Sequence, residues 1–224
     1  DRSLHRHVRD AFRRSPGGRR VGILLAAVGA PLDRTNVDTD QLTPARFMGQ
    51  MGSRARMGEI LFHDLRLDAD GNERPEFVLN QPSYQDAKVL VADSNFGCGS
   101  SRETAVWALV EWGFRAVIAP SFGDIFHSNS SKNGLLAIRL SEDECAEIRR
   151  SLTRNPGTEL SVDLESQTVI VQDGRNEPYR FEFDPFQKHC LMNGVDDIGL
   201  TMEHESMIAA YEERHREDMG WLTD

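Results

Sequence analysis

The residues most suited to chemistry lie in one stretch, Asn95 to Glu103, with the sequence Asn-Phe-Gly-Cys-Gly-Ser-Ser-Arg-Glu. Its two glycines allow the backbone to approach a ligand closely. Ser100 and Glu103 have the spacing of a capping box, which predicts a helix start, and the N–H groups and positive dipole end of a helix start favour an anion. Arg102 opposes that dipole unless an anion faces it, so we interpret it as a carboxylate-binding arginine.

Simpler interpretations of this stretch have to be weighed beside that one. A serine at a helix start commonly does no more than cap it, and Ser100 taken alone fits that role. The spacing of Gly97 and Gly99 resembles a dinucleotide-binding loop, but Arg102 occupies the third glycine position. The G-x-S-x-G pattern of serine hydrolases does not occur here, and a serine without a positioned general base is a poor nucleophile. Cys98 is interpreted as a small turn residue, because one thiolate without a second cysteine nearby cannot hold a metal cluster.

An alternation of strands and helices has to position this stretch. Val89 to Ala92 is predicted as the buried strand before it, and Ser101 to Trp112 as the buried helix after it. Further strands are expected over residues 21–28, 116–119, 135–140, 160–164, 168–172 and 179–183, and further helices over residues 124–129, 141–152, 186–192 and 203–216. The alternation predicts an α/β fold with a largely parallel sheet, and the period of two beyond residue 160 predicts a second β layer beside it.

Local signals predict where some of these elements end and what the loops do. Gly29-Ala30-Pro31 is expected to end the first strand. Ser141 and Glu144 repeat the capping-box spacing and predict the start of the helix over 141–152. Two interpretations stay open for Asp38 and Asp40 in the polar loop that follows the first strand. They either orient a substrate or a partner, or they bond their own backbone in Asx turns.

Composition limits the class of protein. The 224 residues include 26 Lys and Arg against 36 Asp and Glu, for a net charge of −10, which disfavours a nucleic-acid or membrane-surface partner. The sequence has no apolar run near the roughly 18 residues that a membrane span needs and no apolar leader, so we expect a cytoplasmic protein. The three cysteines, Cys98, Cys145 and Cys190, form no C-x-x-C pair, and we expect reduced thiols and no metal site in this chain.

The length fits one large domain with short extensions. We expect a flexible N-terminal extension over residues 1–20, a single domain over 21–211 and a C-terminal tail over 212–224. Within the domain, residues 49–58 combine glycines, methionines and arginines without a period, so we predict a mobile loop of the kind that closes over ligands.

Several blocks of this sequence resemble the small subunit of 3-isopropylmalate dehydratase, in the aconitase superfamily. The most specific block is Asn95 to Glu103, with Trp107-Ala108-Leu109 behind it. Further matching blocks are Pro31-Leu32, Asn36-Val37-Asp38-Thr39-Asp40, Leu61-Phe62, Phe77-Val78-Leu79-Asn80, residues 119–126 and residues 189–194. Together the blocks extend from residue 21 to about residue 211.

The resemblance implies a swivelling β/β/α domain of the aconitase type that works only with a separate large subunit. In the family a 4Fe-4S cluster is bound by that large subunit, and the pair forms a heterodimer or heterotetramer. The implied activity is that of a hydro-lyase acting on a small dicarboxylate. It dehydrates 2-isopropylmalate to 2-isopropylmaleate and rehydrates it to 3-isopropylmalate, in leucine biosynthesis.

Matched position by position, the family motif places a base serine at Ser100, with Ser101 and Arg102 holding a substrate carboxylate. Abstraction of a proton next to a carboxylate builds negative charge, so the base has to lie beside N–H donors and a cation. A serine is a weak base unless its alkoxide is stabilised, and a helix start together with Arg102 provides that stabilisation.

The remaining site residues implied by the resemblance surround this triplet. Asp40 matches an acidic loop position of the family, and Arg54 lies in the loop that should meet the variable group of the substrate. Gly97, Gly99 and Glu103 are expected to support the site structurally.

This sequence departs from the family pattern at three places. Thr104 replaces the usual histidine, Ala105-Val106 replaces the usual Ala-Pro, and the loop from Met48 to Met57 differs from the usual basic, threonine-containing one. The last departure leaves two alternatives open. One is the small subunit of a related hydro-lyase acting on citraconate, 2-methylmalate or dimethylmalate, and the other is a non-catalytic anion-binding partner subunit.

Overall fold

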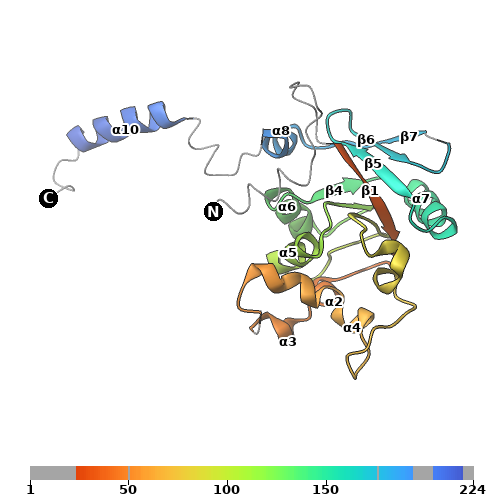
Figure 1. The fold of residues 1–224 in the computed structure, drawn as a ribbon. Coiled ribbons are helices and arrows are strands. Elements are labelled where there is room, and N and C mark those ends of the chain that lie inside the picture. Colours follow the sequence, from red (N-terminus) through yellow and green to blue (C-terminus); the bar gives the residue numbers. More distant parts are fainter. Residues whose placement is uncertain (1–23, 50, 176, 194–203, 219–224) are drawn as a thin grey trace.

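One mixed sheet organises the protein, as a computed structural model shows for residues 24–49, 51–175, 177–193 and 204–218 (Figure 1). Its seven strands have the order β4-β3-β2-β1-β5-β6-β7. The strands are β1 Leu24–Pro31, β2 Val89–Val91, β3 Ala116–Ala119, β4 Leu136–Arg139, β5 Glu159–Asp163, β6 Thr168–Val171 and β7 Pro178–Arg180. The predicted α/β class is confirmed.

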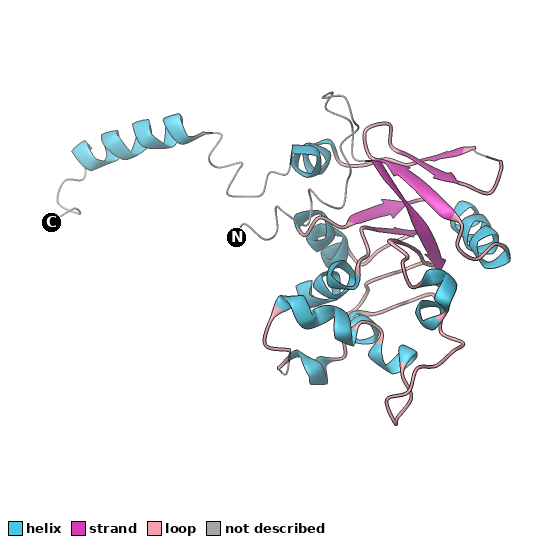
Figure 2. Ribbon diagram, in the orientation of Figure 1, coloured by secondary structure: helices cyan, strands magenta, loops and turns pink. Residues whose placement is uncertain are grey.

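Strand β1 joins a parallel half of the sheet to an antiparallel half. Its C-terminal residues pair in parallel with β2, where Gly29 lies opposite Val89. Its N-terminal residues pair antiparallel with β5, where Leu25 lies opposite Val162. The two β parts expected from the sequence therefore share one strand, and the sheet curls between them (Figure 2).

The prediction that Gly29-Ala30-Pro31 ends the first strand was wrong, because β1 continues to Pro31. A Cβ atom at Gly29 would lie 2.1 Å from the Leu160 side chain, so the glycine permits close packing inside the strand. Pro31 is the last residue of the strand, where its lack of an N–H costs little.

The described residues also form helices. They are α2 Thr39–Leu42, α3 Ala45–Met48, η1 Arg54–Ile60, α4 His63–Arg66, η2 Val78–Asn80, η3 Pro82–Tyr84, α5 Glu103–Trp112, α6 Asp124–Lys132, α7 Glu142–Arg154, α8 Pro185–Asn193 and α10 Glu205–Asp218. The described residues contain no helix long and apolar enough to cross a membrane. Residues 1–20, predicted as a flexible extension, lie outside the described residues, and the predicted domain limits stay predictions.

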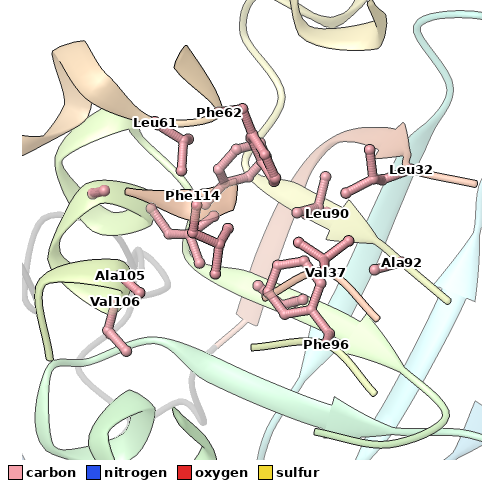
Figure 3. Close-up of a cluster of buried hydrophobic side chains, with 14 of the residues drawn as sticks. Leu32, Val37, Leu61, Phe62, Leu90, Ala92, Phe96, Ala105, Val106 and Phe114 are labelled. Atoms are coloured by element: carbon pink, nitrogen blue, oxygen red, sulfur yellow. The ribbon is translucent and has the colours of Figure 1, made fainter. Parts of the chain in front are cut away.

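Two apolar clusters lie on opposite faces of the parallel half. Along β2, Leu90 belongs to the first cluster, whereas Val89 and Val91 belong to the second. Because successive side chains of a strand point to opposite faces, the two clusters are separated by the sheet. The first also contains α5 side chains such as Val106, together with Phe62, Phe96 and Phe114 (Figure 3). The second contains α7 side chains such as Ile148. Helices α5 and α7 thus cover opposite faces, and α5 is buried as expected.

The prediction of an irregular loop over residues 49–58 was wrong for its second half. Residues Arg54–Ile60 form the 3-10 helix η1, with Met57 and Gly58 buried. A Cβ atom at Gly58 would lie 2.9 Å from backbone atoms of Glu111 and Trp112, so η1 packs directly on the end of α5. Contacts of this kind lack a sequence period, and for that reason the pattern did not predict them.

Candidate active site

The stretch from Asn95 to Arg102 leaves the carboxyl end of β2 and is held by the segments that follow the two neighbouring strands. The Gly97 N–H donates to the Val37 carbonyl at 2.7 Å, on the β1 side. The Phe96 N–H donates to the Ser121 carbonyl at 3.0 Å, on the β3 side. The loop is therefore fixed at the carboxyl edge of the parallel strands, which is where open α/β sheets bind ligands.

The two glycines of the loop are required for different reasons. Gly97 has φ 71°, and an added Cβ would lie 2.3 Å from the ring of Phe126. Gly99 has φ 92°, but an added Cβ would only reach ordinary contact with Asp38 at 3.5 Å. Gly97 therefore permits both a left-handed turn and close packing, whereas Gly99 permits only the turn.

The predicted capping box at Ser100 and Glu103 does not form, and the predicted helix start at Ser101 was wrong. Helix α5 begins at Glu103, and its N-cap, Arg102, makes no side-chain capping bond. Two contacts compete with the box. The Thr39 hydroxyl donates to the Ser100 carbonyl at 3.1 Å, and the Glu103 carboxylate accepts from Asn133 Nδ2 at 2.7 Å. Ser100 consequently lies outside the helix, and the simple capping interpretation of this serine is excluded.

Ser100 and Ser101 are both exposed. Within the part of the chain that the structure describes, neither hydroxyl has a hydrogen-bond partner, whereas the Ser100 backbone is tethered through its carbonyl. The loop thus presents two serine hydroxyls to the solvent on a fixed backbone. This arrangement suits a group that acts on an external ligand.

Arg102 and Asp40 are brought together across the edge of the sheet. Arg102 Nη1 donates to Asp40 Oδ1 at 2.5 Å. Asp38 has a different function, because its carboxylate caps helix α2 by accepting from the Gln41 N–H at 2.7 Å. The Asx interpretation therefore holds for Asp38, whose carboxylate bonds the local backbone. Asp40 instead faces the arginine of the loop, and its contact with a substrate stays a prediction.

Arg54 lies against helix α5. Its Nε donates to Glu111 Oε1 at 3.2 Å, and its guanidinium lies 5.4 Å from the centre of the Trp107 ring. The contacts found for Arg54 join it to α5 and not to the Ser100–Arg102 segment itself. The structure thus places Arg54, in η1, against α5, the helix that follows the loop.

Asn133 gave no signal as a site residue in the sequence. Its side chain is buried at the end of α6 and bonds both Glu103 and Trp107. The only hint available was the four-residue spacing of Glu103 and Trp107, which places them on one face of a helix.

Thr104 stands beside Glu103 in the first turn of α5. Its hydroxyl oxygen is buried and has no hydrogen-bond partner among the described residues. A buried hydroxyl without a partner is costly, so the departure from the family histidine leaves an unsatisfied group behind the loop.

The cysteines of the chain do not fit a metal cluster. Burial, with a smaller contribution from Asp38, raises the pKa of the Cys98 thiol, and burial raises the pKa of Cys145 to about 12. An iron–sulfur cluster needs several thiolates grouped around it. Within residues 24–49, 51–175, 177–193 and 204–218, no three His, Cys, Asp or Glu side chains are grouped so that they could hold a metal ion.

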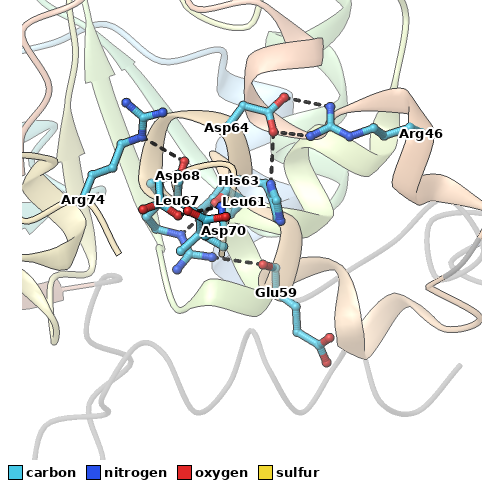
Figure 4. A network of polar contacts seen from close by, with 10 residues as sticks. Arg46, Glu59, Leu61, His63, Asp64, Leu67, Asp68, Asp70 and Arg74 are labelled. Carbon is cyan, nitrogen blue, oxygen red and sulfur yellow. Dashed lines mark hydrogen bonds and ion pairs between the residues drawn. The ribbon is translucent and has the colours of Figure 1, made fainter. Parts of the chain in front are cut away.

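A second polar cluster, around helix α4, is satisfied by its own members (Figure 4). The Arg46 guanidinium binds both carboxylate oxygens of Asp64, which His63 also contacts at 3.0 Å. The bond from Arg46 chiefly lowers the pKa of Asp64, to about 2. Because these charges neutralise one another, the cluster joins α3 to α4 and is not a candidate site.

The mixed sheet, with an exposed serine–arginine loop at the carboxyl edge of its parallel half, defines an α/β domain of the aconitase C-terminal type. The family model of the aconitase C-terminal domain matches residues 23–143. Two further models match: LeuD_N over residues 146–185, and the C-terminal domain of the 3-isopropylmalate dehydratase small subunit over residues 197–224.

Comparison with individual proteins narrows this class. The chain is 48% identical over 198 residues to the 3-isopropylmalate dehydratase small subunit of Paramagnetospirillum magneticum, covering 88% of this chain and 97% of the relative. It is 47% identical over 192 residues to the protein of the same name from Brevibacillus brevis, covering 86% and 97%. The chain belongs to the family of 3-isopropylmalate dehydratase small subunits.

A solved structure supports the fold. The crystal structure of 3-isopropylmalate dehydratase from Methanocaldococcus jannaschii superposes with a TM-score of 0.62 at 22% identity, covering 84% of this chain and 99% of that one. The aconitase-type domain expected from the resemblance is confirmed by the family model and by this fold.

Proposed function

We propose that this chain is the small subunit of a 3-isopropylmalate dehydratase and supplies the proton-transferring and carboxylate-binding residues of the reaction. The observation that carries the proposal is the pair of exposed serine hydroxyls beside Arg102, on a loop that both neighbouring segments fix. The reaction is the interconversion of 2-isopropylmalate and 3-isopropylmalate through 2-isopropylmaleate.

In this proposal Ser100, as its alkoxide, takes the proton from the carbon adjacent to a substrate carboxylate during dehydration, and the substrate hydroxyl group leaves as hydroxide toward the Lewis-acid site that the large subunit would supply. During rehydration Ser100 returns the proton while hydroxide adds back to the other carbon. Ser101 and Arg102 bind that carboxylate. The Arg102 guanidinium, partly buried and next to the start of α5, opposes the negative charge that develops. Asp40 holds Arg102 in place until the substrate carboxylate arrives.

Recognition of the variable group of the substrate is assigned to the η1 segment. Arg54, in η1, donates through its Nε to Glu111 of α5, so its two terminal nitrogens keep donor capacity for a carboxylate of the substrate. The packing of η1 on α5 supports this assignment, because it joins Arg54 to the helix whose N-cap is Arg102.

The partner in this proposal is a large subunit, in a heterodimer or heterotetramer in the cytoplasm. Because the described residues contain no group of three potential metal ligands, the 4Fe-4S cluster is assigned to that large subunit. The small subunit by itself is expected to be inactive.

The test is co-expression of the full chain with a large subunit of the same family, followed by anaerobic reconstitution with iron and sulfide. Hydration of 2-isopropylmaleate is then measured beside citraconate and dimethylmaleate. Ser100→Ala is expected to lower kcat by about 10²- to 10⁴-fold, the usual contribution of a general base. Ser128→Ala, at an exposed serine of α6, is the matched control and should stay within about twofold of wild type.

The outcomes separate the alternatives. Turnover of citraconate or dimethylmaleate alone would indicate the related hydro-lyase, and stable pairing without turnover would indicate a non-catalytic subunit. Arg102→Lys keeps the charge but loses the planar pair of donors, so KM should rise about tenfold or more. An unchanged KM in this variant would contradict the assignment of Arg102 to the carboxylate.

A further inference from the structure

Asn133 connects the two helices behind the candidate site. It is the residue after the last turn of α6, which lies beside α5 (Figure 1), and it is 5% exposed. Its Oδ1 accepts from Trp107 Nε1 at 3.0 Å, and its Nδ2 donates to Glu103 Oε1 at 2.7 Å and to the Asn129 carbonyl at 2.9 Å. One buried amide thus bonds its own helix and two residues of α5.

The two residues that Asn133 holds belong to a stripe on α5. Glu103, Trp107 and Glu111 are each four residues apart, so they lie on one face of the helix. Asn133 bonds the first two members, and Arg54 contacts the last two through the Trp107 ring and the Glu111 carboxylate. The stripe therefore forms a continuous path of contacts from the start of α5 to Arg54.

The first turn of α5 needs such support. Its N-cap, Arg102, makes no side-chain capping bond. The next residue, Glu103, is tied by the short bond to Asn133, and this bond fixes the direction in which the chain leaves Arg102. A displacement of about 1 Å at a substrate-orienting group costs activity out of proportion to its size.

We propose that Asn133 is a positioning residue, which places Arg102 through Glu103 and Arg54 through Trp107 without touching the substrate. The inference rests on the proposed function, because it assigns a purpose to the placement of those two arginines. It predicts that loss of the Asn133–Glu103 bond weakens substrate binding more than it slows the chemical step.

The competing explanation is that Asn133 merely ends a helix. Asn155 offers a control, because it is the C-cap of α7 as Asn133 is the C-cap of α6. In the described part of the chain, the Asn155 side chain makes no hydrogen bond, whereas its backbone carbonyl accepts from Thr158. A helix-end function alone would make the two asparagines equivalent in kinetic experiments.

The test uses the reconstituted complex with 2-isopropylmaleate as the probe. Glu103→Ala removes the acceptor and should raise KM about tenfold, as for one hydrogen bond to a charged group, with kcat within about threefold of wild type. Glu103→Gln keeps an acceptor oxygen for Asn133 and should stay within about threefold of wild type in KM. Asn133→Ala should raise KM at least as much as Glu103→Ala, and Asn155→Ala should leave it unchanged.

Because Asn133→Ala removes a buried group, Glu103→Ala, at an exposed residue, keeps the test valid if the asparagine variant does not fold. An active wild type with an unchanged KM in Glu103→Ala overturns the inference and leaves the proposed function standing. Equal losses in Glu103→Gln and Glu103→Ala also overturn it, because the bond would then not matter. A wild-type complex without turnover overturns the proposed function and this inference with it.

Discussion

Two regions of this protein carry the same Ser-x-x-Glu spacing and fold differently. At Ser141 the capping box forms: Glu144 donates its N–H to the Ser141 hydroxyl at 3.3 Å, and its carboxylate accepts from the Ser141 N–H at 2.8 Å. At Ser100 it does not form, and α5 begins at Glu103. The Ser141 hydroxyl caps α7, whereas the Ser100 hydroxyl is exposed and has no hydrogen-bond partner within the described chain.

The difference teaches that a local motif holds only when nothing stronger competes for its members. Ser141 follows the end of β4, and its hydroxyl and N–H are both satisfied by Glu144. Ser100 follows two left-handed glycines, its carbonyl is tethered by Thr39, and Glu103 is bonded by Asn133. Contacts with distant segments thus release the Ser100 hydroxyl, which makes it available for chemistry.

The largest expected effect comes from breaking the turn that separates the two regions. Gly97→Ala should destabilise the protein by about 3 kcal/mol, because it combines a left-handed backbone with a clash against Phe126. Gly99→Ala puts an alanine in a left-handed backbone without a clash, so it should lower the free energy of unfolding by about 1–2 kcal/mol. Urea unfolding of the full chain measures both. Equal losses would show that the Phe126 contact adjusts without cost.

Replacing each of the two serines by alanine should change the free energy of unfolding by less than the glycine variants do, and by different amounts. Ser141→Ala removes a formed cap and should lower the free energy of unfolding by about 1 kcal/mol, while catalysis stays unchanged. Ser100→Ala removes no cap and should change stability by less than about 0.5 kcal/mol, while activity is lost. Urea unfolding and turnover of the reconstituted complex are measured on the same preparations. A stability loss at Ser100 as large as that at Ser141 would show that Ser100 does cap α5.

The smallest expected effect concerns the first turn of α5. Thr104→Val keeps the branched shape and removes the unbonded buried hydroxyl, so the variant should be more stable by about 1 kcal/mol. A rise in Tm of the full chain checks this expectation, with Thr153→Val as the control, since the Thr153 hydroxyl donates to the Arg149 carbonyl at 2.9 Å. A lower Tm in Thr104→Val would mean that its hydroxyl is satisfied.

Much of the fold could be predicted from local sequence. The apolar runs of β2 and β3 predicted buried strands, and β3 has the predicted bounds of Ala116–Ala119. The capping box predicted the start of α7. These elements depend on neighbouring residues and on burial, both of which leave a pattern in the sequence. Ser100, Ser101 and Arg102 were also predicted as site residues from the sequence, through the long motif around Ser100, whereas Asn133 was not.

The tertiary structure alone decided how those residues are related. Arg102 and Asp40 are 62 positions apart, Arg54 and Glu111 are 57 apart, and Asn133 and Glu103 are 30 apart. No local pattern specifies such pairs, because they depend on which loops meet at the carboxyl edge of the sheet. The sequence by itself determined which groups are present and which segments become strands and helices. Folding decided which serine caps a helix and which one is left free, because long-range hydrogen bonds at Ser100 and Glu103 outcompete the local box.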